Sequence, residues 1–508
     1  MLFNSVPFLF AFFPLTVVVF FVLGFRSPLL AGLWLSGASL FFYTWWNATF
    51  VALLLTSVIF NYCAGCLIGG QFGNIEGRYR RVMLVFAVAA DLLLLAYFKY
   101  AGFFANIARE IFGWAPNFGH IVLPLGISFF TFTQVAFLVD TYQRKAKEFN
   151  FLHYVLFVTY FPHLIAGPIF HHGQIMPQFA DRRTYRIDWT HVYVGMTVFV
   201  IGLFKKIFVA DHFGAIATPI FSDAQQGVTH LMIVAWAGTL AYTLQLYFDF
   251  SGYSDMAVGL SLFFNVKIPL NFNSPYKALS IIDFWRRWHM TLSAFLRDYL
   301  YIPLGGNRKG KVLRYFNLFA TMLLGGLWHG AGWTFVVWGG LHGVYLIANH
   351  GFRALRSRMG WRNRFGLAGE LARGAITFIS VVIAWVFFRA DSFSAASTML
   401  HGMVGSAGFG LLHPSNFTEV SAITLSGRII LASIGIGLIA VWVLPNTQEF
   451  MRAFHPAYES VAQPRGFAAR LTWQPARWWT WSSVGILLAL LILSMSPAHV
   501  SEFLYYQF

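Results

Sequence analysis

Long apolar runs follow one another along almost the whole chain, separated by short polar segments. Each comes close to the roughly 20 residues that cross the apolar part of a bilayer. The runs lie at 6–25, 28–46, 49–70, 82–104, 121–139, 152–169, 191–210, 230–250, 312–328, 332–350, 373–390, 428–445 and 481–496. Several are short or contain Gly and Pro, so some are expected to be re-entrant segments. The pattern predicts an all-α protein that crosses a membrane many times, with about 11–13 membrane segments.

No linker, internal repeat or soluble domain interrupts this pattern, so we expect one integral membrane domain over residues 1–508. The first run has no Lys or Arg before it and no clear cleavage site after it. It is therefore expected to remain as a membrane anchor and not to be removed as a signal peptide.

Positive charge gathers in four of the polar segments. They carry Arg78, Arg80 and Arg81; Arg144, Lys145 and Lys147; Arg353, Arg356, Arg358, Arg362 and Arg364; and Arg452, Arg465, Arg470 and Arg477. The segments around 46–48 and 391–427 are poor in Lys and Arg. Because Lys and Arg concentrate in cytoplasmic loops, these four segments are expected in the cytoplasm and both termini outside it.

Composition excludes a soluble enzyme, because charged residues make up 11% of the chain against about 25% in soluble proteins. The net charge of +16 is assigned to loops that face anionic lipid, and no nucleic-acid partner is expected. Cys63 and Cys66 exclude a disulfide framework and supply only two of the four ligands that zinc needs. His163, His171 and His172 have no acidic or cysteine partner at fixed spacing, so no metal site is expected.

The segment 245–311 carries too many polar side chains for helices that face lipid. Asp249 and Asp255 stand in an otherwise apolar run rich in hydroxyl groups. A carboxylate within a membrane is costly unless it is paired or reaches water. Both are therefore expected to face the protein interior against Arg or His, either as a structural pair or as part of a site.

The run 283–299 has the pattern of a basic amphipathic helix. At helical spacing Trp285, Trp288, His289 and Leu292 share one face, and Arg286, Arg287 and Arg297 fall mostly elsewhere. Ser280 and Asp283 form a weak capping box before it. Such a helix lies at a membrane surface. It is expected to bind either lipid phosphates or a phosphate-bearing cofactor, and the turn 305–308 with Asn307 offers a weak further phosphate signal.

Two histidines lie among small residues between apolar runs. His329 stands in Leu324-Gly-Gly-Leu-Trp328-His329-Gly330, and His342 stands in Trp338-Gly-Gly-Leu-His342. Ionisable groups within a membrane are functional candidates by default. The glycines allow another backbone or a substrate to approach the ring closely, and imidazole is the usual general base. A hydrogen-bonded structural role is the alternative for both.

Several blocks in this part of the chain resemble the membrane-bound O-acyltransferase family. They are Phe161-Pro-His-Leu-Ile-Ala-Gly-Pro168, Tyr247-Phe-Asp-Phe-Ser-Gly-Tyr-Ser-Asp255, Phe284-Trp-Arg-Arg-Trp-His289, Arg297-Asp-Tyr-Leu-Tyr-Ile-Pro-Leu-Gly-Gly-Asn-Arg308 and Gly325-Gly-Leu-Trp-His-Gly330. Within that family the bacterial alginate O-acetylation branch is most similar, also at 124–130, 385–390 and 503–508. The segments 131–136 and 169–174 are more similar to relatives that act on other polymers.

The resemblance implies a helical ring around a central funnel, with a catalytic core at 245–350. It implies that His329 and His289 are catalytic. The residues it implies for binding the donor or substrate are Trp328, Arg286, Arg287, Trp288, Asp249, Asp255, Arg297 and Asn307.

The resemblance also implies the reaction. An acyl group, most simply acetyl from acetyl-CoA, would pass from a cytoplasmic thioester to a hydroxyl of a polysaccharide outside the bacterial inner membrane. No permanently bound cofactor is expected. A periplasmic partner related to SGNH hydrolases would receive the acetyl group, and the aromatic C-terminus would help to dock it. Peptidoglycan, cellulose and teichoic acid are alternative acceptors.

Two other classes of protein fit parts of the pattern. Intramembrane carboxylates, histidines and broken helices also suit an ion-coupled transporter, although repeated halves are not evident. A membrane scaffold without chemistry is the other alternative, and the dense polar blocks within the membrane argue against it.

Overall fold

The computed structural model describes residues 1–73, 76–119, 121–360, 366–410, 414–417, 425–460 and 502–504, together with 420, 471, 473, 485, 488 and 489. Every regular element among them is helical. The helices of the first half are α1 (Phe13–Gly24), α2 (Pro28–Thr44), α3 (Thr49–Gly69), α4 (Gly77–Phe112), α5 (Ile127–Tyr142), α6 (Phe151–Thr159), α7 (His172–Ala180), α8 (Trp189–Phe204) and α9 (Asp211–Gln225).

Those of the second half are α10 (Met232–Phe263), α11 (Ile281–Trp285), α12 (Met290–Leu296), α13 (Lys311–His329), α14 (Trp333–Arg358), α15 (Gly366–Arg389), α16 (Phe393–Met403), α17 (Gly427–Val443) and α18 (Thr447–Phe450). Single π-helical turns precede α1, join α8 to α9 at Lys205–Ala210 and follow α12. Short 3₁₀ turns lie between other elements.

The prediction of a multipass, all-α membrane protein is confirmed. Four helical stretches in the described part are long and apolar enough to cross a bilayer, namely Thr49–Gly69, Gly77–Phe112, Trp189–Gln225 and Gly366–Arg389. Shorter apolar helices are Phe8–Gly24, Pro28–Thr44 and Gly427–Val443. The run predicted at 481–496 lies almost wholly outside the described residues, as do Arg362, Arg364, Arg465, Arg470 and Arg477.

The prediction of one apolar span at 152–169 is wrong. Helix α6 ends at Thr159, and the next residues form irregular turns. Pro162 disfavours helical backbone at Phe161, and the Phe161 N–H donates to Ser39 Oγ of α2 at 3.2 Å instead of continuing the helix. This stretch is thereby buried beside α2, where side chains satisfy its backbone.

Helix α10 is the central element and is buried along most of its length. It packs closely against α8 because two pairs of glycines meet, Gly195 with Gly259 and Gly202 with Gly252. A Cβ atom on any of the four would lie 2.6–2.8 Å from the carbonyl oxygen of its partner. Small residues at such crossings let two backbones approach within a membrane.

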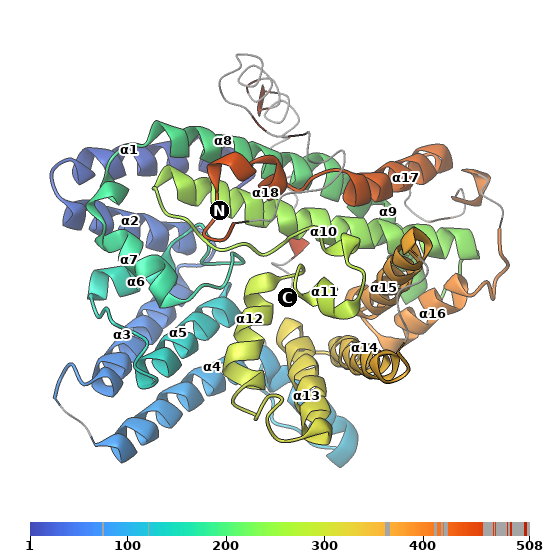
Figure 1. Ribbon diagram of the computed structural model, residues 1–508, viewed down its shortest axis with the longest axis horizontal. Helices are drawn as coiled ribbons and strands as arrows, with labels where there is room; N and C mark the ends of the chain where they lie inside the picture. Colours follow the sequence, from blue (N-terminus) through green and yellow to red (C-terminus); the bar gives the residue numbers. More distant parts are fainter. Residues whose placement is uncertain are drawn as a thin grey trace.

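The helices surround two short ones in the middle of the molecule. Figure 1 shows α11 and α12 at the centre, with α10 along one side and α4 and α5 along another. Helices α13, α14 and α15 lie along the remaining side. This arrangement agrees with the expected ring. Segments of the chain far apart in sequence therefore meet around α11 and α12.

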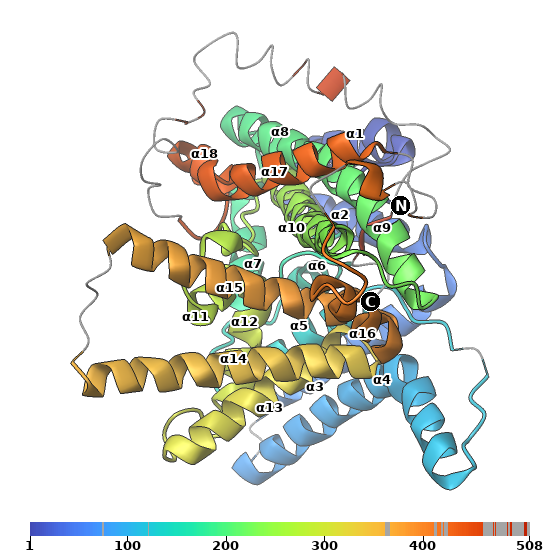
Figure 2. The ribbon, with the colours of Figure 1, turned by 90° about the vertical axis from the view of Figure 1, so that its right-hand side faces the viewer.

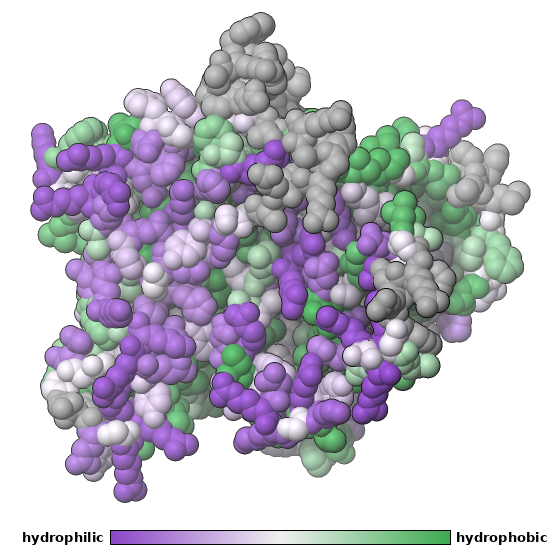
Figure 3. Space-filling view, in the orientation of Figure 1, coloured by the Kyte–Doolittle hydropathy of each residue, from purple (hydrophilic) through white to green (hydrophobic). Residues whose placement is uncertain are grey.

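One side of the molecule collects the positively charged helix ends. In Figure 2 the starts of α4, α13 and α15 and the end of α14 lie toward the left, and the N-terminus is marked on the opposite side. The left side of Figure 2 is the face seen in Figure 1, and Figure 3 shows that hydrophilic residues cover most of it.

Candidate active site

His329 is the last residue of α13, and its backbone is held by side chains of α4. The Lys99 ammonium donates to the carbonyl oxygens of Trp328 at 2.6 Å and of His329 at 3.2 Å. Tyr100 donates to the carbonyl oxygen of Leu327 at 3.0 Å. The last carbonyl groups of a helix have no partners within it, and a cation there also interacts favourably with the helix dipole. Lys99 and Tyr100 therefore fix the end of α13.

The crossing of α13 with α14 depends on glycine. A Cβ atom on Gly326 would lie 2.3 Å from the Phe335 carbonyl oxygen, and one on Gly339 would lie 2.4 Å from that of Met322. The expectation that the glycines before His329 allow a close approach is thus met by another backbone. This contact sets where His329 and His342 stand relative to each other.

Aromatic rings surround the His329 imidazole, which is only 4% exposed. Its ring centroid lies 4.9 Å from that of Trp328, 5.1 Å from that of Trp338 and 5.3 Å from that of Phe388. These rings come from the end of α13, from α14 and from α15. Three elements thus build one mainly aromatic pocket around the His329 ring.

The predicted continuous helix at 283–299 is wrong. Helix α11 ends at Trp285, α12 begins at Met290, and His289 between them has a positive φ of 41°. The reason is pairing with the segment before α11: Met290 N–H donates to the Asn271 carbonyl oxygen, and Asn273 N–H donates to that of Arg287, both at 2.9 Å. The Ser280 side chain does cap α11, as predicted, by accepting from Asp283 N–H at 3.2 Å.

This break turns His289 into the interior, where it is fully buried. Its ring centroid lies 6.3 Å from that of His329 and 4.8 Å from that of Phe250 on α10. His342 is also fully buried, and its Nδ1 accepts from Trp285 Nε1 at 3.3 Å. The two histidines expected to be catalytic are therefore brought together, and a third is linked to α11.

A cavity of about 530 Å³ lies next to this pocket. Trp285, Met290 and Thr291 line it on the side of His289, and its other walls include Arg286, Arg297, His171, His350 and Glu459. Burial raises the pKa of the Glu459 carboxyl above its ordinary value, while Leu270 N–H donates to that carboxyl at 2.9 Å. The cavity is therefore mainly basic on its polar side and reaches the residue next to His289.

Asp249 and Asp255 are buried in ion pairs with lysines, so the expectation of Arg or His partners is wrong. Lys206 Nζ lies 2.8 Å from Asp249, and Lys205 Nζ lies 2.6 Å from Asp255. Both lysines belong to the π-helical turn between α8 and α9. The inserted residue of such a turn changes which way side chains point, and here two successive lysines reach two carboxylates of α10.

The end of the chain joins the Asp249 pair. Leu504 N–H donates to Asp249 at 3.0 Å, and Lys206 donates to the Glu502 carbonyl oxygen at 2.8 Å. Phe503 is fully buried and lies 5.0 Å from Tyr253 between ring centroids. The expected docking role of the aromatic C-terminus does not hold for Phe503, and residues 505–508 lie outside the described residues.

The other predicted site residues are divided between the pocket and the surface. Trp288 is buried and stacks on Phe284 at 5.7 Å, whereas Arg287 forms an ion pair with Asp283 at 3.0 Å. Arg297 pairs with its neighbour Asp298 at 2.7 Å. Asn307 is exposed in a turn. Of the predicted arginines, Arg286 and Arg297 line the cavity beside His289, and Arg287 does not.

Sequence reasoning missed two polar features. Lys99 lies in an apolar run, and the only signal was a charge where lipid would be expected. Asp140 lies 3.5 Å from both His171 and His172, and Tyr299 donates to it at 2.8 Å. Within the described ranges, no group of three or more His, Cys, Asp or Glu side chains is arranged to hold a metal ion.

Comparison with known proteins identifies the family of the chain. The model of the membrane-bound O-acyltransferase family matches residues 40–388. A peptidoglycan O-acetyltransferase of Helicobacter pylori is 44% identical over 444 residues, which cover 82% of both chains. A probable alginate O-acetylase of Pseudomonas aeruginosa is 38% identical over 543 residues, which cover all of both chains.

A teichoic acid D-alanyltransferase of Bacillus subtilis is 30% identical over 252 residues, which cover 47% of this chain and 61% of that protein. The family match includes α11, α12 and α13, and with them both histidines of the buried pocket. This multipass membrane protein therefore belongs to the membrane-bound O-acyltransferase family and is an O-acyltransferase.

Proposed function

We propose that the protein transfers an acetyl group from a cytoplasmic thioester, most simply acetyl-CoA, to hydroxyl groups of a polysaccharide outside the inner membrane. The observation that carries the proposal is the buried pair His289 and His329, 6.3 Å apart between ring centroids and next to an arginine-lined cavity. An imidazole ring can accept or donate a proton. One ring can therefore act on the acceptor hydroxyl while the other acts on the thioester carbonyl.

The donor would enter the cavity of about 530 Å³. Arg286 and Arg297 would meet its phosphates there, and the thioester would reach past Met290 toward His289. The phosphates of a nucleotide thioester need basic partners, and Arg binds phosphate oxygens through two parallel hydrogen bonds. This role uses the two predicted arginines that line the cavity.

His329 would act as the general base. Its ring nitrogen takes the proton of the acceptor hydroxyl while the hydroxyl oxygen attacks the thioester carbonyl carbon. The carbon–sulfur bond then breaks, and the thiol leaves with the proton that His329 has held. His289 would donate a hydrogen bond to the carbonyl oxygen as negative charge develops on it. The aromatic rings around His329 would exclude water, which would otherwise hydrolyse the thioester.

The acceptors named for the relatives point to the class of polymer that this protein acetylates. Peptidoglycan is the acceptor to test first, because the Helicobacter pylori relative has the highest identity of those compared over most of the chain. An alginate-like polymer follows from the Pseudomonas aeruginosa relative. A periplasmic partner of the SGNH type would take the acetyl group when the polymer itself does not reach the pocket. The basic side would face the cytoplasm and both termini the periplasm.

Histidine variants test the proposal. His329→Ala and His289→Ala are expected to lower acetylation by about 10²- to 10⁴-fold, the usual contribution of general acid–base catalysis. The measurement is mass spectrometry of ester-linked acetate on muropeptides and surface polysaccharide from a deletion strain that carries each variant. His212→Ala, a half-buried histidine of α9, is the matched control and is expected to keep full acetylation.

Each variant is first checked for its amount in the membrane and for a single peak in size-exclusion chromatography. Unchanged acetylation in the His329→Ala strain would overturn the assignment of the base. Unchanged acetylation in the His289→Ala strain alone would remove His289 from the mechanism and leave His329 in it.

A further inference from the structure

A second cavity, of about 740 Å³, lies between α11, α14 and α15. It shares Ile282 and Arg286 with the cavity beside His289 but extends to Arg353 and Arg356 near the end of α14 and to residues of α15, which do not line that cavity. We propose that it binds an anionic phospholipid, with the phosphate at its arginines and the acyl chains along its apolar walls. This binding does not depend on the proposed acetyl transfer.

The charge around the cavity favours a phosphate. Four arginines line it, namely Arg286, Arg353, Arg356 and Arg373. Asp283 also lines it, but it already forms an ion pair with Arg287 at 3.0 Å. Glu370 lies 3.8 Å from Arg373. In the part of the chain that the structure describes, no carboxylate lies within ion-pair distance of Arg286 or Arg353, so positive charge is in excess.

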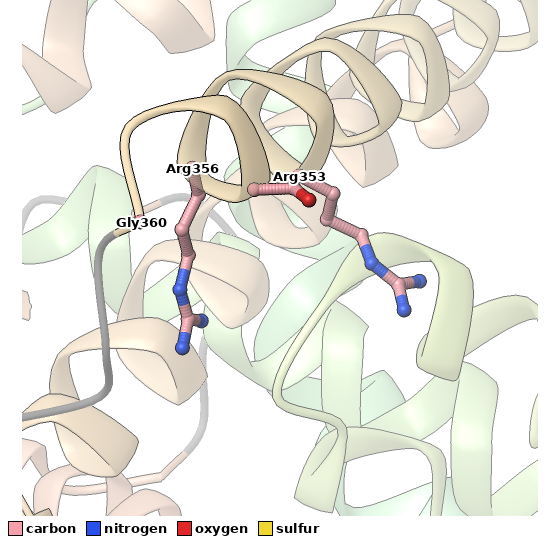
Figure 4. Close-up of a pocket in the computed structure, with 4 residues that line it drawn as sticks. Arg353, Arg356 and Gly360 are labelled. Carbon is pink, nitrogen blue, oxygen red and sulfur yellow. The ribbon is translucent and has the colours of Figure 1, made fainter.

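Two of these arginines lie in the last turns of α14. Figure 4 shows that the guanidinium groups of Arg353 and Arg356 both extend to the same side of α14. With Ser357 and Gly360 they also line a smaller hollow of about 250 Å³ at that end. Basic pockets between helices at a membrane surface are typical sites for anionic lipid headgroups.

The apolar walls argue for a lipid over a soluble anion. They include Leu279, Ile282 and Ala348, as well as Phe352 and Ile376, which are 52% and 68% exposed. Inorganic phosphate gains nothing from large exposed apolar side chains beside its binding site, because it has no apolar surface to bury. In a membrane protein these side chains face acyl chains, so one ligand with a phosphate and two alkyl chains fits both kinds of wall.

Such a lipid would act on the candidate active site through α11. The cavity is lined by Ile281, Ile282 and Asp283 of that helix, and Trp285 at its end donates to His342. A bound lipid would hold this five-residue helix, which its own backbone hydrogen bonds stabilise little. We therefore expect acetyl transfer to rise with the anionic lipid content of the membrane.

Lipid binding is tested with the purified full-length protein in neutral detergent. The probes are phosphatidylglycerol, phosphatidylcholine and free coenzyme A, and the readouts are lipid retained in native mass spectrometry and the midpoint of thermal unfolding. Phosphatidylglycerol is expected to be retained and to raise the midpoint, and phosphatidylcholine is not. In the double variant Arg353→Ala/Arg356→Ala the affinity for phosphatidylglycerol should fall about twenty-five-fold, roughly fivefold for each arginine.

Two variants keep the test independent of folding defects. Arg78→Ala/Arg81→Ala removes the same charge from the exposed end of α4 and is expected to keep wild-type retention. Ala348→Trp narrows the cavity with all four arginines in place and should also weaken retention. Equal retention by Arg353→Ala/Arg356→Ala and wild type, or equal effects of the two lipids, would overturn the proposal. Displacement of phosphatidylglycerol by coenzyme A would assign the cavity to the donor instead.

Discussion

The Lys99 side chain of α4 donates to the His329 carbonyl oxygen at 3.2 Å. A histidine at the last position of a helix has little backbone support beyond it, because the final carbonyl groups lack partners within the helix. Lys99 supplies that support from a different helix. The direction of the His329 ring therefore depends on how α4 and α13 pack together.

Replacing Lys99 should change turnover more than donor binding. In Lys99→Met, kcat is expected to fall about a hundredfold, as displacements near 1 Å of a catalytic group do, while KM for the donor stays close to wild type. Lys99 does not line the cavity proposed to bind the donor, whose lining residues come from other elements. The measurement is steady-state transfer from acetyl-CoA by purified protein.

Lys99→Arg keeps a cation at the end of α13 and should restore part of kcat, which a loss of folding alone would not explain. A fall in kcat/KM that comes entirely from KM would contradict the positioning role. Arg78→Ala, which removes a charge from the first turn of the same helix, is the control.

At the residue scale, the sequence singled out two histidines that the fold brings together, but it did not indicate the side chains that hold them in place. His329 and His289 stand in motifs that resemble those of a family, so they could be named before any geometry was known. Lys99 carries no motif, and its contact with α13 spans 230 positions of the chain. The partners of Asp249 and Asp255 were likewise mistaken, because a π-helical turn decides where Lys205 and Lys206 point.

Among the elements, the junction between α11 and α12 shows how tertiary contacts override a local pattern. The periodicity of 283–299 favours one helix, but backbone hydrogen bonds to Asn271 and Asn273 break it at His289. A histidine on a continuous surface helix would have faced lipid headgroups. The break is what brings its ring within 6.3 Å of His329.

The contact between the π-helical turn and α10 is a stability element. Lys206 and Asp249 are 3% and 2% exposed and 2.8 Å apart. Removing one partner leaves a buried charge, so Lys206→Met should destabilise the protein by about 3–5 kcal/mol. The double variant Lys206→Met/Asp249→Leu should recover much of that loss, since it removes the buried carboxylate. The second carboxylate beside Lys206, that of Asp211 at 2.9 Å, is 31% exposed and can be solvated by water.

Thermal unfolding in detergent of both single variants and the double variant measures the coupling. Exposed Arg183, paired with Asp181 at 2.7 Å, serves as control, and Arg183→Ala is expected to leave the midpoint of thermal unfolding close to that of the wild type. Additive losses in the double variant would show that Lys206 and Asp249 do not stabilise each other.

For the whole molecule, the distribution of arginine defines two sides. The ends of α4, α14 and α15 that carry Arg78, Arg356 and Arg373 lie together on one side, and the N-terminus lies on the other (Figure 2). The apolar runs and the charges of their connections were enough to predict this arrangement. The break at 286–289 was not predictable, because it depends on backbone contacts with Asn271 and Asn273. Pro162 was a local signal for the break at 160–171, but the contact with Ser39 was not predictable.

Orientation in the membrane can be measured with single cysteines. In a chain with Cys63→Ser and Cys66→Ser, Arg78→Cys and Arg356→Cys should react with a membrane-impermeant maleimide only after the inner membrane is opened. Ala48→Cys, exposed between α2 and α3, should react in spheroplasts with an intact membrane. Labelling of Arg78→Cys in intact spheroplasts would reverse the proposed orientation, and the cysteine-free chain is the control.

The hydrogen bond from Leu504 to Asp249 has a consequence for how the protein is made. The two residues are 255 positions apart, so the ribosome completes half of the chain after α10 emerges and before this donor exists. Until Leu504 has been made, the Asp249 carboxylate lacks the hydrogen bond that this N–H donates. The interior around Asp249 is therefore completed only after Leu504 has been made, and a chain truncated before Leu504 is expected to fold less stably.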